Sequence, residues 1–209
     1  MTKYKYLCNH SFFKEQNEKS FYWAGFIAAD GSLIKRKYSK ISKICLSIKD
    51  IEHLEKFKSN IQSNHPIKIY NNSCEIVIVS NFIYEDLKIF DIIPNKTKIY
   101  SMPEWLEQHE LYYHFLRGYF DGDGTITSCG LVKNRKIIQK NWSILGTEKF
   151  ITQYLKFLTK NNLPQAKIRK HSSVFKISCS GNRNIQKIYE LLYSNSIIFL
   201  DRKLLKFKL

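Results

Sequence analysis

The 209-residue sequence predicts an α+β protein built as a pseudo-twofold pair of αββαββα halves. The first observation is a duplication: residues 21–33 and residues 114–126 are both apolar runs with small residues inside, closed by Asp-Gly, a small hydroxyl residue and an aliphatic one. The second observation is that each run is followed by the same order of strand-like and helix-like patterns. The closing acids of the two runs are Asp30 and Asp123. A duplicated acid in a duplicated element predicts one site assembled from both halves.

The composition indicates a folded protein. Hydrophobic residues make up 44% of the chain and charged residues 25%, which excludes disorder. No apolar stretch approaches the roughly 18 residues of a membrane span, and the first residues lack a secretory signal. The five cysteines are scattered singly, so we expect no disulfide framework, no structural zinc and a reducing compartment. Bacterial or phage cytoplasm and an organelle fit this composition equally.

The first half shows four strand-like segments and two helical patterns after its acidic motif. Asp50 is placed as the N-cap of a helix whose apolar residues recur at helical spacing, and a second, shorter helix begins near Asn81. Alternating or β-branched runs bounded by turn residues predict the strands. These strands are residues 33–37, 41–48, 67–70 and 74–79.

The second half repeats this order. Thr147 caps one helix, and Gly181 with Asn182 begins another. The predicted strands are residues 125–132, 137–145, 166–170 and 174–179. Two prolines mark a linker at residues 94–109. We therefore predict an N-terminal half at residues 1–98 with an arm at 1–19, a linker at 99–109, and a C-terminal half at 110–209 that ends in a basic segment.

Charge is concentrated and patterned. The net charge is +16 and the pI is near 9.6, an excess that is typical of proteins with a polyanionic partner. Basic and apolar residues alternate in the strands at 67–70 and 166–171, so each sheet should have one apolar face and one cationic face. Two such sheets would form a basic saddle able to enter the major groove of a DNA duplex, although a merely solvated lysine-rich face is the alternative. The candidate DNA contacts are Lys35, Arg36, Lys43, Lys68, Tyr70, Lys133, Arg135, Lys140, Arg169 and Lys176.

Small residues inside the two motif runs predict a helix–helix interface. An internal glycine costs a helix about 1 kcal/mol relative to alanine, and close approach of a second helix is a reason to accept that cost. The two runs would then pack face to face at the pseudo-twofold axis and bring Asp30 and Asp123 to the same end. The predicted interface consists of Gly25, Ala28, Gly118, Asp121 and Gly122.

Paired acids at helix C-termini predict a cation. The helix dipole disfavours a carboxylate in the last turn, and two adjacent carboxylates repel each other. Oxygen ligands of this kind suit Mg²⁺, with Mn²⁺ as a substitute, and a metal beside a duplex-binding face would hydrolyse phosphodiesters. The predicted metal site comprises Asp30, Asp123, Ala29 and Gly122. The alternative is that Asp-Gly marks hairpin turns, which a single copy would favour and two matched copies do not.

The two motifs resemble those of the LAGLIDADG homing endonucleases. Residues 23–31 are similar to one copy of the family motif and residues 116–124 to the other, and the resemblance extends over the chain from about residue 11. Two copies imply the single-chain form: a monomer that cuts both strands of a long, weakly symmetric double-stranded DNA site and leaves short 3′ overhangs. Asp30 and Asp123 match the catalytic, metal-binding acids of the family. Its earlier acidic position is kept as Asp121 and replaced by Ala28 in the first copy.

The resemblance also implies basic residues around the metals, and binding without cleavage in Ca²⁺. Lys96 lies in a segment that resembles one such position, Arg202 and Lys203 are alternatives for its counterpart, and Lys49 is a further candidate. Two other functions stay open: an RNA maturase that assists intron splicing, and a non-catalytic DNA-binding regulator of the same fold. Retention of both motif acids favours the nuclease.

Overall fold

The computed structural model describes residues 4–35, 41–129, 139–163 and 166–208. The first half comprises η1 (Phe12–Lys14), α1 (Glu18–Asp30), β1 (Gly31–Lys35), β2 (Ser42–Ile48), α2 (Ile51–Asn60), β3 (Ile67–Ile69), β4 (Cys74–Val79) and α3 (Asn81–Lys88). Next come η2 (Lys96–Lys98) and α4 (Glu104–Gln108). The second half comprises α5 (Tyr112–Asp123), β5 (Gly124–Cys129), β6 (Gln139–Gly146), α6 (Glu148–Lys160), β7 (Lys167–His171), β8 (Val174–Ser180), α7 (Asn182–Tyr193) and α8 (Asp201–Lys208).

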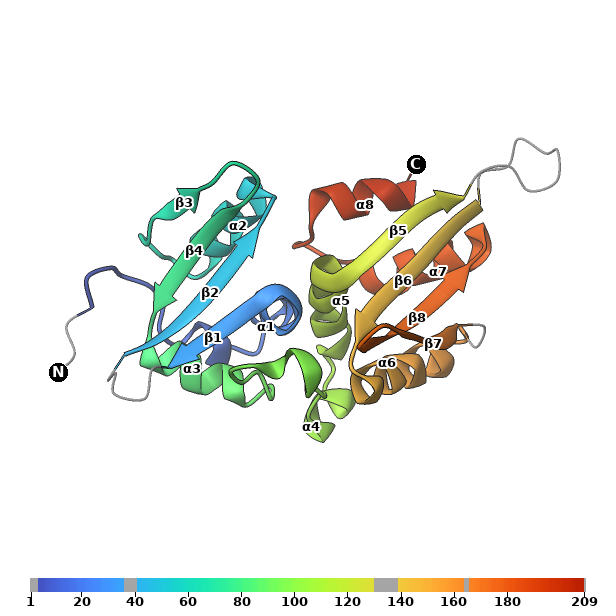
Figure 1. The fold of residues 1–209 in the computed structure, drawn as a ribbon, viewed down its shortest axis with the longest axis horizontal. Coiled ribbons are helices and arrows are strands. Elements are labelled where there is room, and N and C mark those ends of the chain that lie inside the picture. The colour runs from blue at the N-terminus through green and yellow to red at the C-terminus, as the bar shows by residue number, and fades with distance from the viewer. Residues whose placement is uncertain (1–3, 36–40, 130–138, 164–165, 209) are drawn as a thin grey trace.

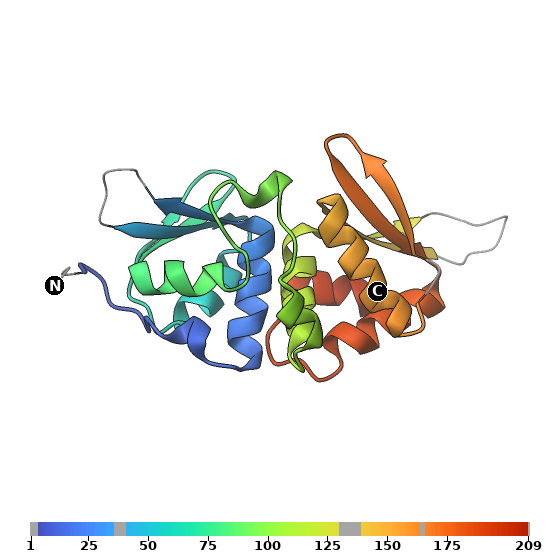
Figure 2. The same cartoon turned by 90° about the horizontal axis from the view of Figure 1, so that it is seen from below.

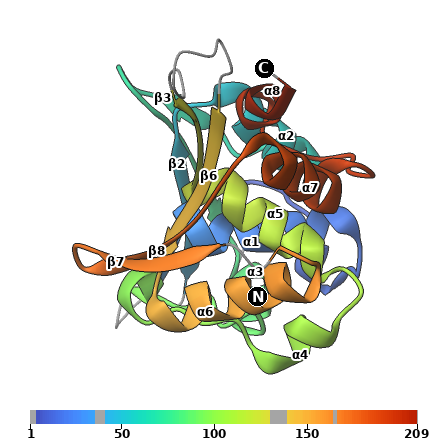
Figure 3. The same cartoon turned by 90° about the vertical axis from the view of Figure 1, so that its right-hand side faces the viewer.

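Each half contains one antiparallel sheet with the same topology. The strand orders are β1-β2-β4-β3 and β5-β6-β8-β7, so each sheet is two hairpins joined through their second strands. The two sheets lie side by side, and the helices cover one face of both, as Figures 1 and 3 show. Buried residues alternate with exposed ones along β2, which fits a sheet with one covered face. The α+β pseudo-twofold architecture is therefore confirmed.

The motif helices α1 and α5 pack against each other at the centre of the molecule (Figure 2). A Cβ at Gly25 would collide with the carbonyl of Phe115, and a Cβ at Gly118 would collide with the carbonyl of Tyr22. The contact is reciprocal because Phe115 and Tyr22 each stand three residues before the glycine of their own helix. The motif helices therefore meet at the centre as the fold prediction required, with Ala28 buried in α1 and Gly122 facing Ala29 across the helix pair.

A buried ion pair joins the two halves near the start of α1, at the opposite end of that helix from Asp30. The guanidinium of Arg117 on α5 is fully buried and donates to Glu18 at the start of α1 over 2.6 Å. Its other nitrogens donate to the carbonyls of Leu192 and Ile198. Glu18 in turn accepts the backbone N–H of Ile197 at 2.7 Å. The segment that leads to α8 is thereby tied to both motif helices.

The structure adds two helices to the expected pattern. The predicted linker contains α4, whose first turn carries Glu104 and Glu107. The basic C-terminal segment forms α8, which begins at Asp201. Residues 36–40 and 130–138, which cover the predicted turns between the first two strands of each half, lie outside the described residues. No helix in the described part of the chain is long and apolar enough to cross a bilayer.

The close helix contact predicts an unusual response to alanine. Gly118→Ala would normally stabilise a helix, but here the added methyl meets the backbone of Tyr22. We expect the free energy of unfolding to fall by about 2 kcal/mol or more because the two helices must separate. Urea titration checks this, with Thr152→Ala on the exposed face of α6 as the control helix substitution. An unchanged stability of Gly118→Ala would contradict the packing.

Candidate active site

Two carboxylates lie together where the motif helices end. Asp30 closes α1 and Asp123 closes α5, and each is followed by a glycine that begins a strand in nearly the same conformation. A Cβ at Gly122 would lie 3.5 Å from the carboxylate carbon of Asp30, so the two helix ends are in contact. Asp30 keeps part of its surface in contact with solvent although protein atoms surround much of its carboxyl group, and Asp123 is half-buried. The predicted convergence of the two acids is present in the structure.

Their surroundings destabilise the charged forms of both acids. Burial raises the pKa of Asp123 to about 6, and the negative charge of Asp30 acts in the same direction. Burial also raises the pKa of Asp30. Lys203 and Lys96 oppose both shifts, and the nearby hydroxyl of Tyr119 also lowers the pKa of Asp123. The first half has Phe26 at the position of Tyr119, so Asp30 has no equivalent hydroxyl.

Lys96 is buried beside the first acid. Its ammonium donates to the carbonyl of Gly31 over 2.6 Å, directly after Asp30 in the chain. Burial lowers the pKa of Lys96 to about 8, whereas Asp123 and Asp30 raise it. Lys96, which the sequence analysis named as a candidate, therefore lies at the paired acids.

Lys203 occupies the counterpart position in the second half. Its ammonium donates to the carbonyls of Phe120 at 2.6 Å and of Gly122 at 3.0 Å, on either side of Asp121. Burial lowers the pKa of Lys203 to about 8, and the nearby carboxylates, Asp121 foremost, oppose this.

The neighbouring Arg202 points elsewhere. Its Nε donates to both carboxylate oxygens of Asp50, the N-cap residue of α2, at 2.8 Å. The structure thus distinguishes Arg202 from Lys203, the two alternatives that the sequence left open: Lys203 contacts the second motif and Arg202 contacts Asp50. Arg202 still contributes positive charge that lowers the pKa of Asp30.

Lys49 is placed by its position in the chain. It follows β2 directly, precedes the N-cap residue Asp50, and is exposed. Gly146 holds the matching place before Thr147, the N-cap residue of α6. A catalytic role for Lys49 stays a prediction.

The donor set fits a hard cation shared with a phosphate. Among the described residues no group of three or more His, Cys, Asp and Glu side chains could enclose a metal, so an all-protein cage is not formed there. Two carboxylates are what Mg²⁺ usually takes from a protein when phosphate and water complete its shell. The carbonyl of Gly122 faces the same end but already accepts from Lys203.

Solved structures share this architecture. The LAGLIDADG homing endonuclease I-GzeII in complex with its DNA target superposes with a TM-score of 0.63 and 16% identity over 93% of this chain and 88% of the other. The meganuclease I-SmaMI bound to DNA gives 0.62 and 16% over 87% and 86%. The LAGLIDADG meganuclease I-AabMI bound to uncleaved DNA gives 0.62 and 12% over 90% and 87%. The protein has the LAGLIDADG homing endonuclease fold. No protein-family model matches the sequence, and a search of the curated proteins found no match either.

The open faces of the two LAGLIDADG sheets carry half of the predicted DNA contacts. Strand register puts Lys68 opposite Glu75 and Arg169 opposite Lys176, on the face away from the helices. Strand parity puts the predicted contacts Lys43, Lys68, Tyr70, Arg169 and Lys176 on this face, but burial does not alternate in β3 and β7, where Ile69 is 71% exposed and Ile168 is only half-buried. Arg36, Lys133 and Arg135 lie outside the described residues.

Two predicted contacts lie on the other face, which corrects the expectation. Lys35 contacts α3: its ammonium is 3.7 Å from the Glu85 carboxylate and lies over the ring of Tyr84. Lys140 donates to the carbonyl of Phe207 near the end of α8 over 2.8 Å. Both residues occupy strand positions with helix-facing parity, which the charge of the residue alone could not reveal.

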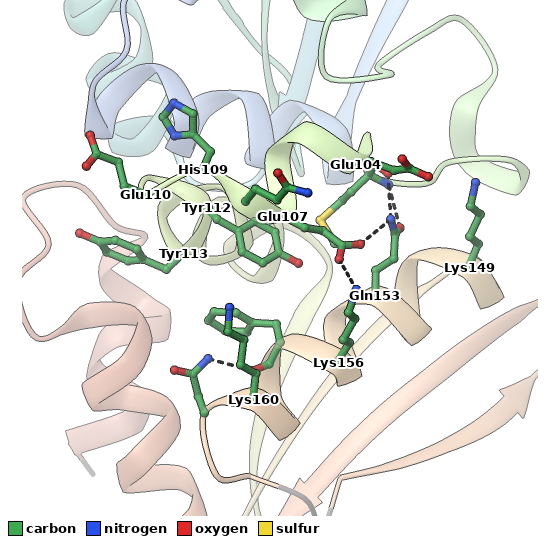
Figure 4. A pocket seen from close by; sticks show the side chains of 14 residues that line it. Glu104, Glu107, His109, Glu110, Tyr112, Tyr113, Lys149, Gln153, Lys156 and Lys160 are labelled. Atoms are coloured by element: carbon green, nitrogen blue, oxygen red, sulfur yellow. Dashed lines mark hydrogen bonds and ion pairs between the residues drawn. The ribbon is translucent and has the colours of Figure 1, made fainter.

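Two cavities differ in their relation to the paired acids Asp30 and Asp123. A hollow of about 290 Å³ on the open face of the second sheet is lined mostly by hydroxyl and amide side chains, among them Thr125, Asn141 and Ser178. A larger cavity of about 700 Å³ lies between α4, α5 and α6, with Glu107 and Lys156 paired across it (Figure 4). None of the residues lining the larger cavity belongs to the acid site.

Sequence reasoning missed the charged residues that hold the C-terminal segment. Lys56 on α2 pairs with Asp201 at 2.6 Å, and Arg117 with Glu18 at the same distance. The available signal was the arginine inside the second apolar motif, because a charged side chain in an apolar run must find hydrogen-bond or ion-pair partners if it is buried.

The raised pKa of Asp123 predicts that this acid lowers stability. The folded-state pKa lies above the unfolded value, so the cost of ionisation is full above pH 6 and vanishes toward pH 4. In metal-free buffer at about pH 8, Asp123→Asn should raise the free energy of unfolding by about 1–2 kcal/mol, and the gain should disappear at acid pH. Urea titrations across pH test this, with the exposed loop variant Asp91→Asn as control. An equal gain at all pH values would contradict the electrostatic origin.

Proposed function

We propose that the protein is a site-specific double-strand DNA endonuclease that acts as a monomer, depends on a divalent metal and leaves short 3′ overhangs. The observation that carries this proposal is the pair of helix-end carboxylates, Asp30 and Asp123, each with a buried lysine on the adjacent motif carbonyls. A purely structural turn would need neither the paired acids nor the two buried cations, which cost free energy to desolvate.

Each residue of the site has a separate part in this proposal. Asp30 and Asp123 would hold Mg²⁺, or Mn²⁺ in its place. The metal would activate water and stabilise the leaving oxygen of a phosphodiester. Lys96 and Lys203 place positive charge beside the acids, where the negative charge of a scissile phosphate would develop.

The structures of similar fold support DNA as the substrate. I-SmaMI has been observed with uncleaved DNA in the presence of calcium ions and with cleaved DNA. For this chain the open sheet faces supply the matching surface, because they carry Lys68 and Arg169 at their outer strands. We accordingly expect Ca²⁺ to support binding without cleavage. An RNA maturase or a regulator without cleavage would leave the DNA intact in the test below.

The cleavage test needs DNA that the protein itself selects. Duplexes recovered from a randomised library by the wild-type protein in Ca²⁺, together with a duplex of the uninterrupted host allele, are incubated with Mg²⁺. We expect cutting of both strands, and a loss of about a hundredfold or more in Asp30→Asn and in Asp123→Asn because each removes a metal ligand. The matched control is Asp91→Asn, because Asp91 is an exposed carboxylate in a loop, distant in sequence from both Asp30 and Asp123.

Three outcomes would contradict the proposal. Absence of cutting by the wild type in Mg²⁺ and in Mn²⁺ would overturn the endonuclease. Cutting retained by both aspartate variants would overturn the assigned site. Undiminished cutting in EDTA would overturn the metal requirement.

The basic open faces predict a steep salt dependence of DNA binding. Five described cations lie there, namely Lys43, Lys68, Lys167, Arg169 and Lys176. If each neutralises one phosphate, affinity should fall on the order of 10²–10³-fold between about 50 and 200 mM salt, because counterions are released. Fluorescence anisotropy in Ca²⁺ measures this.

A pair of double variants locates the effect. Lys167→Ala with Arg169→Ala should reduce the log–log salt slope by about two, whereas Lys156→Ala with Lys160→Ala on α6 should leave it unchanged. A slope that is flat in the wild type, or that changes equally in both pairs, would contradict the basic-face assignment.

A further inference from the structure

Asp121 is a fully buried carboxylate two residues before the second acid. It accepts three hydrogen bonds: from the hydroxyl of Tyr22 at 2.7 Å, from the backbone N–H of Leu200 at 2.8 Å, and from the hydroxyl of Tyr193. Its donors come from α1, from the segment before α8, and from α7. A buried acid with this many partners fixes the relative position of the elements that supply them.

The hydrogen bond to Leu200 leads directly to Lys203. The carbonyl of Leu200 accepts the N–H groups of Lys203 at 2.9 Å and Leu204 at 3.1 Å, so Leu200 starts the first turn of α8. One turn later the ammonium of Lys203 returns to the carbonyls of Phe120 and Gly122, the residues on either side of Asp121. The second motif therefore holds α8 at two points, and Asp121 supplies the first of them.

The first half has no such arrangement. Ala28 stands at the position of Asp121, and Lys96 is placed by local backbone instead. Asn95 adopts a left-handed conformation with φ of 60°, and the N–H groups of Ile99 and Tyr100 bond the carbonyl of Lys96 at 2.9 and 2.8 Å. Both lysines lie at the ends of the motif helices, but they bond different motif carbonyls and are held in different ways.

We propose that Asp121 is a positioning residue that holds Lys203 beside the paired acids Asp30 and Asp123 through Leu200, and that its loss affects the cutting of the two DNA strands unequally because Lys96 is held without it. This inference rests on the proposed endonuclease function. Loss of Asp121 should slow cutting of one DNA strand much more than the other. A merely structural role would lower the fraction of folded enzyme and slow both strands equally.

The strand-resolved experiment uses Asp121→Ala, which gives the second motif the residue of the first. Library-selected duplexes that carry a different fluorophore on each 5′ end report the two cutting rates in Mg²⁺. We expect the ratio of the two rates to change by about tenfold or more, in the same direction as in Lys203→Met and opposite to Lys96→Met. Asp121→Asn keeps an acceptor for Leu200 and should restore most of the ratio.

A matched control separates positioning from stability. Leu158→Ala removes a fully buried side chain from α6 of the same half and should leave the strand ratio unchanged. Should Asp121→Ala fail to fold, Asp121→Leu, which has the same branching of heavy atoms but no acceptors, takes its place.

Amide hydrogen exchange tests the same link without DNA. In Asp121→Ala the amide of Leu200 and the first turn of α8 should exchange about tenfold faster or more, while residues 96–100 stay as in the wild type. Unchanged exchange at Leu200, or an unchanged strand ratio in an enzyme that cuts both strands, would overturn the inference. If the wild type cuts no duplex, the proposed function fails, and the catalytic part of this inference fails with it. The exchange result then reports only whether Asp121 anchors α8.

Discussion

The close approach of α1 and α5 is the contact on which the rest of the molecule depends. Gly25 and Gly118 let each helix meet the backbone carbonyl of the other, in places where any side chain would collide. Because the contact is reciprocal, it fixes the pseudo-twofold axis and brings both helix C-termini to one point. Each helix then passes directly into the first strand of its own sheet, so the same contact also sets the position of both sheets.

This geometry creates an electrostatic problem that the two lysines partly solve. Two carboxylates meet at the negative ends of two helix dipoles, and the charge of one destabilises the charged form of the other. Lys96 and Lys203 donate to carbonyls in the last turn or immediately after it, where helix backbone groups lack internal partners. The lysines in turn lose hydration, which lowers their pKa values. Such a cluster is poorly stabilised by itself and is suited to a cation and a polyanion that complete it.

The fold was predictable because its signals are local and repeated, whereas part of the site was not. The spacing of Gly25 and Gly118 before their acids indicates both the helix pair and the convergence of Asp30 with Asp123. The faces of Lys35 and Lys140 depend on strand parity, and a shift of one residue reverses the face. The assignment of Lys203 over Arg202 depends on Asp50, an acid some 150 positions away that binds the arginine and that no local pattern connects to it.

The two halves differ most where their site residues are held. Arg117, Tyr119 and Asp121 occupy one motif, and Ala24, Phe26 and Ala28 occupy the same places in the other. Each of these polar groups has a partner in the second half or in the segment before α8, and Arg117 and Asp121 also bind Glu18 and Tyr22 on α1. The polar residues themselves stand in the second motif only. A symmetric homodimer would carry these polar groups twice. In this chain they are needed once, because a single C-terminal helix, α8, contacts both halves: Lys203 binds α5 and Arg202 binds Asp50. One chain can thus hold the two lysines by unequal means, which frees each half to change separately against an asymmetric duplex.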